Sequence, residues 1–585
     1  MRNVLLVGWD AASWSQIHPL LDSGAMPHLS RLVEQGIMGS LATFAPVASP
    51  LLWASLSTGR FPDTHGVLDS HEPDERTAGV RPVTRASLRA PHVWEILAQA
   101  GVSARSIAWP VTHPAAGPAT CVSGAFAAGL ANCTFPKDLE EKLAELRFHP
   151  QEWTTAELKA FVPELAKIDQ DKDRGLARLA VLLSEAVTVQ AAATSLLESS
   201  PGGFTAIWFG AIGAACQAFL TDCHPVYRQV IAGVYRFLDQ MLGRLVQLAG
   251  PEACMLLVSD RSAVGATTPN RAASPRGILA AAGPGIQADE LAFGVSLLDI
   301  APTILALHDF EPAPGMAGRR IPEICPASPS RTLIESPAPA REPAPDALHV
   351  NREIAALQPL GYKDAIAQAA RPQSEEQRKR QSLNLARVLT AQGRDPEALP
   401  LFEQLASEDP NRNEIRLLLA HACYRSGRIA ECRRISEQLL KQFPHHPLEP
   451  AAMAMLAIAE GRPGEALAQL DASRGREDLD AALHVAVGEL YLKLGRAEKA
   501  IAAFQSAIRS DPALATAHEA LARALLLCGL LEESAEAAMN AVRIRYDLPS
   551  AHLALARALL ALDRKDDANR AFAVAERLTR CAVTA

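Results

Sequence analysis

Two aspartates stand where an α/β protein places ligand-binding side chains. Asp10 and Asp260 each follow directly on a short apolar run that is typical of a buried strand. Ligands of parallel sheets bind at the carboxyl ends of the strands, so we expect both carboxylates near a ligand. Each also has a simpler interpretation. Asp10 can cap the helix that follows it, and Asp260 can form a structural ion pair with the adjacent Arg261 or with Arg271 and Arg276.

The elements that must position these aspartates alternate between strand-like and helical patterns. The expected strands are Val4–Val7, Ala104–Ala108, Thr205–Phe209 and Met255–Ser259, and the expected helices are Ser15–Gly36, Val93–Ala98 and Val226–Leu248. This alternation predicts an α/β fold with a mostly parallel sheet flanked by helices. The charged, helical stretch of residues 130–200 interrupts the alternation, and we interpret it as a cap-like insertion.

Nine short motifs follow one another over residues 1 to 323. They are Val7–Asp10, Met26–Leu32, Ala48–Gly59, Pro62–Gly66, Ala108–Pro114, Val258–Asp260, Gly277–Gly285, Leu297–Leu305 and Met316–Arg320. Their order resembles that of type I phosphodiesterase/nucleotide pyrophosphatase proteins, which belong to the alkaline-phosphatase superfamily. The resemblance implies the α/β fold of that superfamily for the N-terminal part of the chain.

The resemblance also implies a chemistry. Members of the superfamily bind two divalent metals, usually zinc, beside a serine or threonine nucleophile; one metal lowers the pKa of the hydroxyl group and the other stabilises the leaving oxygen. By resemblance, Asp10 is a metal ligand, Ser49 is the nucleophile and Asp260 is a ligand of the second metal. Ser49 has an alternative role as the cap of the helix that carries Trp53.

Other metal ligands of the family are missing from this sequence. Where the family has Asp-x-x-x-His, this chain has Ile212 and Cys216, or Gly213 and Gln217 if the register shifts by one residue. Neither pair supplies a carboxylate or an imidazole, the groups that zinc prefers beside thiolate. The position is therefore a departure from the pattern of the family, whichever register holds.

A second departure follows the strand that ends near Asp260. Arg261 stands where the family has histidine, and no histidine occurs between His224 and His308. A guanidinium beside two carboxylates neutralises the charge that a metal would carry, or it holds a phosphate or sulfate group. The retained positions can bind one divalent cation, Mg²⁺ or Zn²⁺, but the usual two-zinc centre is not expected.

The C-terminal part repeats with a period of 34 residues. Glycine or aspartate recurs at Gly393, Gly427, Gly461, Gly495, Gly529 and Asp563, and five residues later come Ala398, Cys432, Ala466, Ala500, Ser534 and Ala568. The first set permits a left-handed turn between paired helices, and the second lets those helices pack closely. The period resembles the tetratricopeptide repeat and predicts an all-α solenoid of about six repeats over residues 377–585. Such a solenoid binds a protein or peptide partner, or mediates self-association.

The remaining features concern the connection and the location. Proline-rich residues 324–350 predict an extended linker, and residues 351–376 predict a connecting helix. The net charge of −8 without a long basic run argues against nucleic acid as a partner. We find no signal peptide and no apolar run long enough to span a membrane. The ten cysteines contain no Cys-x-x-Cys pair, so we expect a cytoplasmic protein without a disulfide framework.

Three interpretations of the function remain open. The first is a phosphodiesterase-like domain whose two-metal site is dismantled, acting as a scaffold or ligand-sensing module beside protein-binding repeats. The second is an active phosphoesterase that uses Asp10, Ser49 and Asp260 with a single metal. The third is an inert domain that accompanies a functional solenoid.

Overall fold

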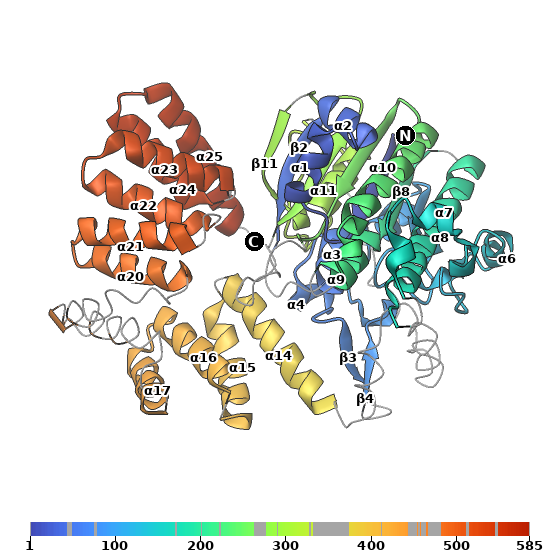
Figure 1. The fold of residues 1–585 in the computed structure, drawn as a ribbon. Helices are drawn as coiled ribbons and strands as arrows, with labels where there is room; N and C mark the ends of the chain where they lie inside the picture. The colour runs from blue at the N-terminus through green and yellow to red at the C-terminus, as the bar shows by residue number, and fades with distance from the viewer. Residues whose placement is uncertain are drawn as a thin grey trace. The chain divides into compact units, whose positions relative to one another are not determined.

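The computed structural model describes residues 2–43, 49–74, 79–169, 172–200, 202–220, 224–262, 276–288, 290–326, 329–331, 374–392, 394–410, 412–442, 453, 457, 462, 464, 465, 468, 481–510, 514–544 and 548–583. The chain divides into two compact units, Met1–Val388 and Leu389–Ala585 (Figure 1). The first unit is built around a large sheet, and the described part of the second unit is helical.

A nine-stranded mixed sheet forms the centre of the first unit. Its order is β11-β2-β10-β9-β1-β8-β5-β6-β7, with the bounds β1 Asn3–Trp9, β2 Ile37–Ala42, β5 Ala104–Ile107, β6 Thr120–Val122, β7 Thr134–Phe135, β8 Phe204–Phe209, β9 Ala253–Val258, β10 Arg276–Ala282 and β11 Glu290–Ser296. Strand β1 pairs in parallel with β8 on one side and β9 on the other. Strand β10 is antiparallel to both β9 and β2. The predicted α/β fold with a mostly parallel sheet is therefore confirmed.

Helices cover both faces of this sheet (Figure 1). Those used below are α1 Trp14–Asp22, α2 Pro27–Glu34, α3 Ser49–Thr58, α4 Pro62–His65, α5 Val93–Gln99, α9 Ala211–Phe219, α10 Val230–Ala249 and α11 Ile300–Leu307. Successive side chains of a strand point to opposite faces, so β1 supplies two hydrophobic clusters. Leu5 and Val7 belong to the cluster formed with α9 and α10, whereas Val4 and Leu6 belong to the cluster formed with α3, α5 and α11.

The single helix expected over Ser15–Gly36 is wrong. Two helices, α1 and α2, occupy this stretch, and the chain breaks between them. Gly24 has a φ of 68°, in the left-handed region that ends a helix, and Pro27 is the first residue of α2. The apolar periodicity continues across the break because both helices bury a face against the same cluster.

The described part of residues 130–200 contains three α-helices, α6 Asp138–Ala144, α7 Thr155–Leu158 and α8 Gly175–Ser199. Within the described residues, α8 is the one helix that is long and apolar enough to cross a membrane. Of its most apolar stretch, 61% is buried inside the protein. Its side chains join the cluster that contains Leu5 and Val7. This burial is typical of a core helix.

Two further elements of the first unit lie outside the main sheet. The hairpin of β3 (His71–Asp74) and β4 (Gly79–Pro82) follows α4 in the sequence. Helix α14 spans Ser374–Ala391, and its residues as far as Val388 belong to the first unit. The predicted linker and connecting helix fall mostly on residues 332–373, which lie outside the described residues.

The second unit consists of paired helices. Their bounds are α15 Asp395–Glu408, α16 Asn413–Arg425, α17 Ile429–Gln442, α20 Ala481–Lys493, α21 Ala497–Ser510, α22 Ala515–Leu527, α23 Leu531–Ile544, α24 Pro549–Ala561 and α25 Lys565–Val583. The turn residues Gly427, Gly495, Gly529 and Asp563 all have positive φ, as the 34-residue period predicts. The small residues five positions later are buried where they are described, at Ala398, Cys432, Ala500, Ser534 and Ala568.

Candidate functional site

The topology brings the two predicted aspartates together. Asp10 follows β1, and Asp260 comes two residues after the end of β9, the parallel neighbour of β1. Both residues are buried, with 7% of Asp10 and none of Asp260 exposed. The backbone N–H of Ala11 donates to Asp260 Oδ1 at 3.1 Å, so the turn after β1 fixes the second carboxylate. The sequence expectation that both lie at one edge of the sheet agrees with this geometry.

Helix α3 supplies two side chains to the same point. Ser49, its first residue, donates its hydroxyl to Asp10 Oδ1 at 2.7 Å. Trp53, one turn later, donates its indole N–H to the same oxygen at 3.2 Å. Asp10 thus receives two hydrogen bonds from one face of α3, and the hydroxyl of Ser49 is held against a carboxylate.

Arg261 places its guanidinium beside both carboxylates. Its Nη1 atom lies 2.5 Å from Asp260 Oδ2 and 3.4 Å from Asp10 Oδ1. Only 20% of the Arg261 side chain is exposed. Burial acts to lower the pKa of Arg261, but the charges of Asp260 and Asp10 outweigh it and raise the pKa. Arg261 therefore keeps its positive charge inside the cluster.

The electrostatics of Asp260 complement those of Arg261. Burial and the neighbouring charge of Asp10 raise the pKa of Asp260, while Arg261 and the N–H of Ala11 oppose the rise. Two carboxylates in a water-poor site repel each other, and a cation between them relieves that repulsion. The guanidinium of Arg261 supplies a positive charge within 3.4 Å of both carboxylates.

Helix α9 also packs closely against Asp10. A Cβ atom on Gly213 would lie 1.8 Å from Asp10 Oδ2, so glycine allows this close approach. The Cys216 thiol is buried, and its pKa is raised to about 12 by burial and then by the charge of Asp10. Gln217 is exposed. The side of α9 near Asp10 thus carries Gly213 and Cys216. These residues come one from each of the two pairs considered above, Ile212 with Cys216 and Gly213 with Gln217.

One acidic residue near this site was missed by sequence reasoning. Glu185 lies in the middle of α8, and burial together with the charge of Asp10 raises its pKa to about 7. Its side chain comes from the inserted stretch rather than from a strand end. The signal that could have found it is a single acid within the apolar run from Ala180 to Val189.

The cluster does not fit a two-metal centre. Within the part of the chain that the structure describes, no group of three or more His, Cys, Asp or Glu side chains could hold a metal ion. The space between Asp10 and Asp260 faces the guanidinium of Arg261 instead. Arg271, considered above as a partner of Asp260, lies outside the described residues.

Two buried histidines form side-chain contacts with serines of α3. His65 Nε2 lies 2.7 Å from Ser55 Oγ, and His92 Nδ1 lies 2.8 Å from Ser57 Oγ. Burial lowers the pKa of His65 to about 3 and that of His92 to about 4. Both rings are therefore neutral at physiological pH and hold the helix that carries Ser49.

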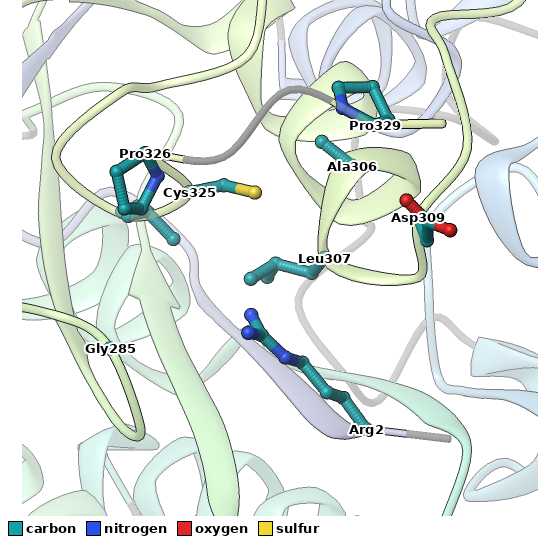
Figure 2. A pocket seen from close by; sticks show the side chains of 9 residues that line it. Arg2, Gly285, Ala306, Leu307, Asp309, Cys325, Pro326 and Pro329 are labelled. Atoms are coloured by element: carbon teal, nitrogen blue, oxygen red, sulfur yellow. The ribbon is translucent and has the colours of Figure 1, made fainter. Parts of the chain in front are cut away.

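A cavity of about 290 Å³ lies away from this cluster (Figure 2). Arg2 lines it, immediately before the start of β1, whereas Asp10 follows the end of that strand. The thiol of Cys325 points into it, and Leu307 and Asp309 line another side. This cavity is therefore at the opposite end of β1 from the predicted site residues.

Comparison with protein families identifies both parts of the chain. Residues 4–308 match the family of type I phosphodiesterase / nucleotide pyrophosphatase. Residues 389–456, 451–515, 488–547 and 549–573 match tetratricopeptide-repeat families. The two resemblances stated from sequence motifs are thereby confirmed.

Several solved structures are similar to part of the chain. A thermophilic tetratricopeptide-repeat protein of Thermus thermophilus is 25% identical with a TM-score of 0.29, covering 31% of this chain and 99% of that chain. MamA is 18% identical with a TM-score of 0.25, over 28% and 95%. The human IFIT1 dimer with PPP-AAAA is 17% identical with a TM-score of 0.32, over 40% and 57%. No curated protein matches the sequence.

Proposed function

This chain belongs to the type I phosphodiesterase / nucleotide pyrophosphatase family, and we propose that its N-terminal domain has lost two-metal hydrolysis and acts as a scaffold or ligand-sensing module. The repeats would recruit a protein or peptide partner. The observation that carries this proposal is the guanidinium of Arg261, which contacts both Asp10 and Asp260.

The charge of Arg261 opposes the binding of a divalent cation at the two carboxylates. A divalent cation bound by Asp10 and Asp260 would have to displace Arg261 or share the space with its positive charge. Displacement would leave a guanidinium, which does not deprotonate in proteins, without its partners. The side chain is covalently tethered at the site, so it competes with any metal at a high effective concentration.

The packing of α9 against Asp10 leaves no room for a further metal ligand at position 213. A carboxylate at position 213 would need its Cβ atom where Asp10 Oδ2 now lies, since the two would be 1.8 Å apart. Real Cβ atoms do not approach other atoms this closely. Helix α9 has thus packed into the volume that an additional ligand would require.

Ser49 is the residue that would have to attack phosphorus in a hydrolytic site. A serine hydroxyl is a weak nucleophile unless a base or a metal removes its proton. The hydroxyl donates to Asp10, but that carboxylate also accepts from Trp53 and faces Arg261. All three contacts involve Asp10 Oδ1, so the hydroxyl of Ser49 acts as one of the donors that hold this carboxylate. Ser49 is therefore better placed to hold Asp10 than to attack phosphorus.

The same cluster suggests which ligand such a module would sense. Arg261 is partly exposed, and Ser49 lies at the start of α3 beside it. Guanidinium and hydroxyl groups bind phosphate and sulfate esters without needing a metal. The ligand that we propose for this module is therefore an anion, such as a phosphate or sulfate ester, and not a metal-bound substrate.

A second candidate function is a phosphoesterase that uses a single metal. The observation in its favour is that Asp10, Ser49 and Asp260 do converge, with Ser49 2.7 Å from Asp10. Hydrolysis of an aryl phosphodiester by the full-length chain, with added Zn²⁺ or Mg²⁺, separates the two candidates. We expect no turnover above the Ser49→Ala variant. Metal-dependent turnover that the Ser49→Ala substitution abolishes would support the second candidate instead.

A further inference from the structure

Helix α14 presents one polar face to a segment of the first unit. Gln377, Arg380, Gln381 and Asn384 all contact Leu68–His71, the segment between α4 and the β3–β4 hairpin. Their spacing of three, four and seven residues places them on one side of a helix. These contacts lie within the first compact unit, which extends to Val388.

Asp69 is the centre of this contact. It is only 2% exposed, although it is a carboxylate on a loop. Arg380 Nε lies 2.8 Å from Asp69 Oδ2, and Gln377 Nε2 donates to the same oxygen at 3.2 Å. The other oxygen accepts the backbone N–H of Ser70 at 2.7 Å. The ionised form of Asp69 therefore depends on α14 for its cation and for one of its hydrogen bonds.

Backbone carbonyls of the segment are also satisfied by α14. The carbonyl of His71 accepts from Gln377 at 2.8 Å and from Gln381 at 3.3 Å. The carbonyl of Leu68 accepts from Asn384 at 3.0 Å, and Asn384 is 7% exposed. Removing the hydrogen-bond partner of a buried polar group without replacing it destabilises the folded state. The contact is therefore specific in register and not a general attraction of charges.

The segment leads directly to the candidate site. Val67 donates its N–H to His65 Nδ1 at 3.2 Å, and the other nitrogen of His65 lies 2.7 Å from Ser55 Oγ. Ser55 is in α3, the helix that places Ser49 against Asp10. These contacts, joined by the short backbone stretch from Val67 to Asp69 and by helix α3 from Ser55 to Ser49, thus link α14 to the candidate site.

We propose that α14 is a coupling helix, which holds Leu68–His71 and thereby stabilises α3. The 34-residue period assigns this helix to the first repeat, yet its residues up to Val388 belong to the first compact unit. A partner that changes the position of α14 would therefore alter the support of α3. The inference does not depend on whether the Asp10 site hydrolyses anything.

Hydrogen exchange of the full-length chain, followed by mass spectrometry, tests the inference. Arg380→Ala and Asp69→Asn should each increase the exchange rate of amides in residues 66–74 roughly tenfold, with a smaller increase in residues 49–58. Raising the salt concentration from 0.1 M to 1 M should have the same effect on the wild type, because Arg380 is 60% exposed and the pair is screened. Arg378→Ala is the matched control, since Arg378 is an exposed arginine of the same helix with no contact among those above.

Three outcomes are informative. Faster exchange in both regions, with Arg378→Ala like the wild type, supports the coupling helix. Unchanged exchange in residues 66–74 for both variants would show that α14 does not hold the segment. Faster exchange in residues 66–74 with no change in residues 49–58 would overturn the coupling to α3. Metal-dependent turnover would contradict the proposed function but leave each of these readouts unaffected.

Discussion

The guanidinium of Arg261 lies 2.5 Å from the fully buried carboxylate of Asp260. The residues are adjacent in the chain, and their side chains turn toward each other at the end of β9. This pair has the form of a metal site in which the cation is part of the protein.

Removing the Arg261 charge should destabilise the first unit. Arg261→Gln leaves Asp260 buried beside Asp10 without a cation, and we expect the free energy of unfolding to fall by about 3 kcal/mol. Urea denaturation followed by tryptophan fluorescence measures this change, because Trp53 contacts the same carboxylate cluster at Asp10.

Two further variants provide a control and a rescue for the Arg261→Gln substitution. Arg228→Gln removes an exposed arginine of the same unit and should change the free energy of unfolding by less than about 0.5 kcal/mol. Adding Asp260→Asn to Arg261→Gln removes the unpaired charge and should restore part of the loss. Equal stability of Arg261→Gln and the wild type would mean that the pair does not balance the buried charges.

The close approach of α9 to Asp10 predicts intolerance of a side chain at Gly213. Gly213→Ala would place a methyl group 1.8 Å from Asp10 Oδ2, and we expect a loss of roughly 1–3 kcal/mol from the shift of α9 or Asp10. Gly124→Ala is the matched control, because a Cβ there meets its nearest atom at 3.4 Å. Thermal unfolding of both variants checks the difference. A Gly213→Ala protein as stable as the control would contradict the packing of α9 on Asp10.

The buried histidines predict a loss of stability in mild acid. The pKa values of about 3 for His65 and about 4 for His92 lie below the ordinary value near 6.5, so the unfolded chain binds more protons between those limits. The free energy of unfolding therefore falls as the pH decreases from 6.5 toward 4. At pH 5 each histidine should account for roughly 2 kcal/mol of this loss.

Glu185 acts in the opposite direction, because its pKa is raised to about 7 and its contribution to stability falls as the pH rises through that range. The contribution of His65 is therefore isolated by comparing how steeply the free energy of unfolding depends on pH in different variants. The pH dependence of unfolding should be flatter in His65→Gln than in the wild type, and unchanged in His149→Gln, which alters an exposed side chain. Identical slopes for His65→Gln and the wild type would be inconsistent with a buried neutral His65.

Exposed leucines on the repeats offer a contact for a partner. Leu527 in α22 is 70% exposed and Leu560 in α24 is 48% exposed. Replacing both with serine should reduce capture of a partner protein by the full-length chain at least tenfold, without loss of helical circular dichroism. Glu532→Ser is the control, and sedimentation velocity distinguishes partner binding from self-association. Undiminished capture would place the interaction on another surface.

The sequence predicted the fold class correctly, but it predicted only part of the site. Asp10, Ser49, Asp260 and Arg261 could be found because strand ends and ordered motifs mark them, and the structure brings their side chains together. The role of Gly213 could not be foreseen, because a missing side chain gives no signal until the packing of α9 is known.

Glu185 and the break in the first helical stretch illustrate two other limits. Glu185 is far from Asp10 in sequence, and only the packing of α8 brings its charge near. In the stretch Ser15–Gly36 the apolar period runs unbroken, whereas Gly24 and Pro27 determine where the chain turns. Local backbone preferences prevailed over the hydrophobic pattern there.

The bound zinc content of the purified full-length chain tests the central claim most directly. Arg261 between Asp10 and Asp260 predicts that the protein, after equilibration with zinc and removal of excess metal, retains much less than one zinc ion per chain. Elemental analysis by mass spectrometry gives this stoichiometry, and Ser49→Ala should leave it unchanged. Retention of one or two zinc ions per chain would show that a metal displaces Arg261, and would contradict the account.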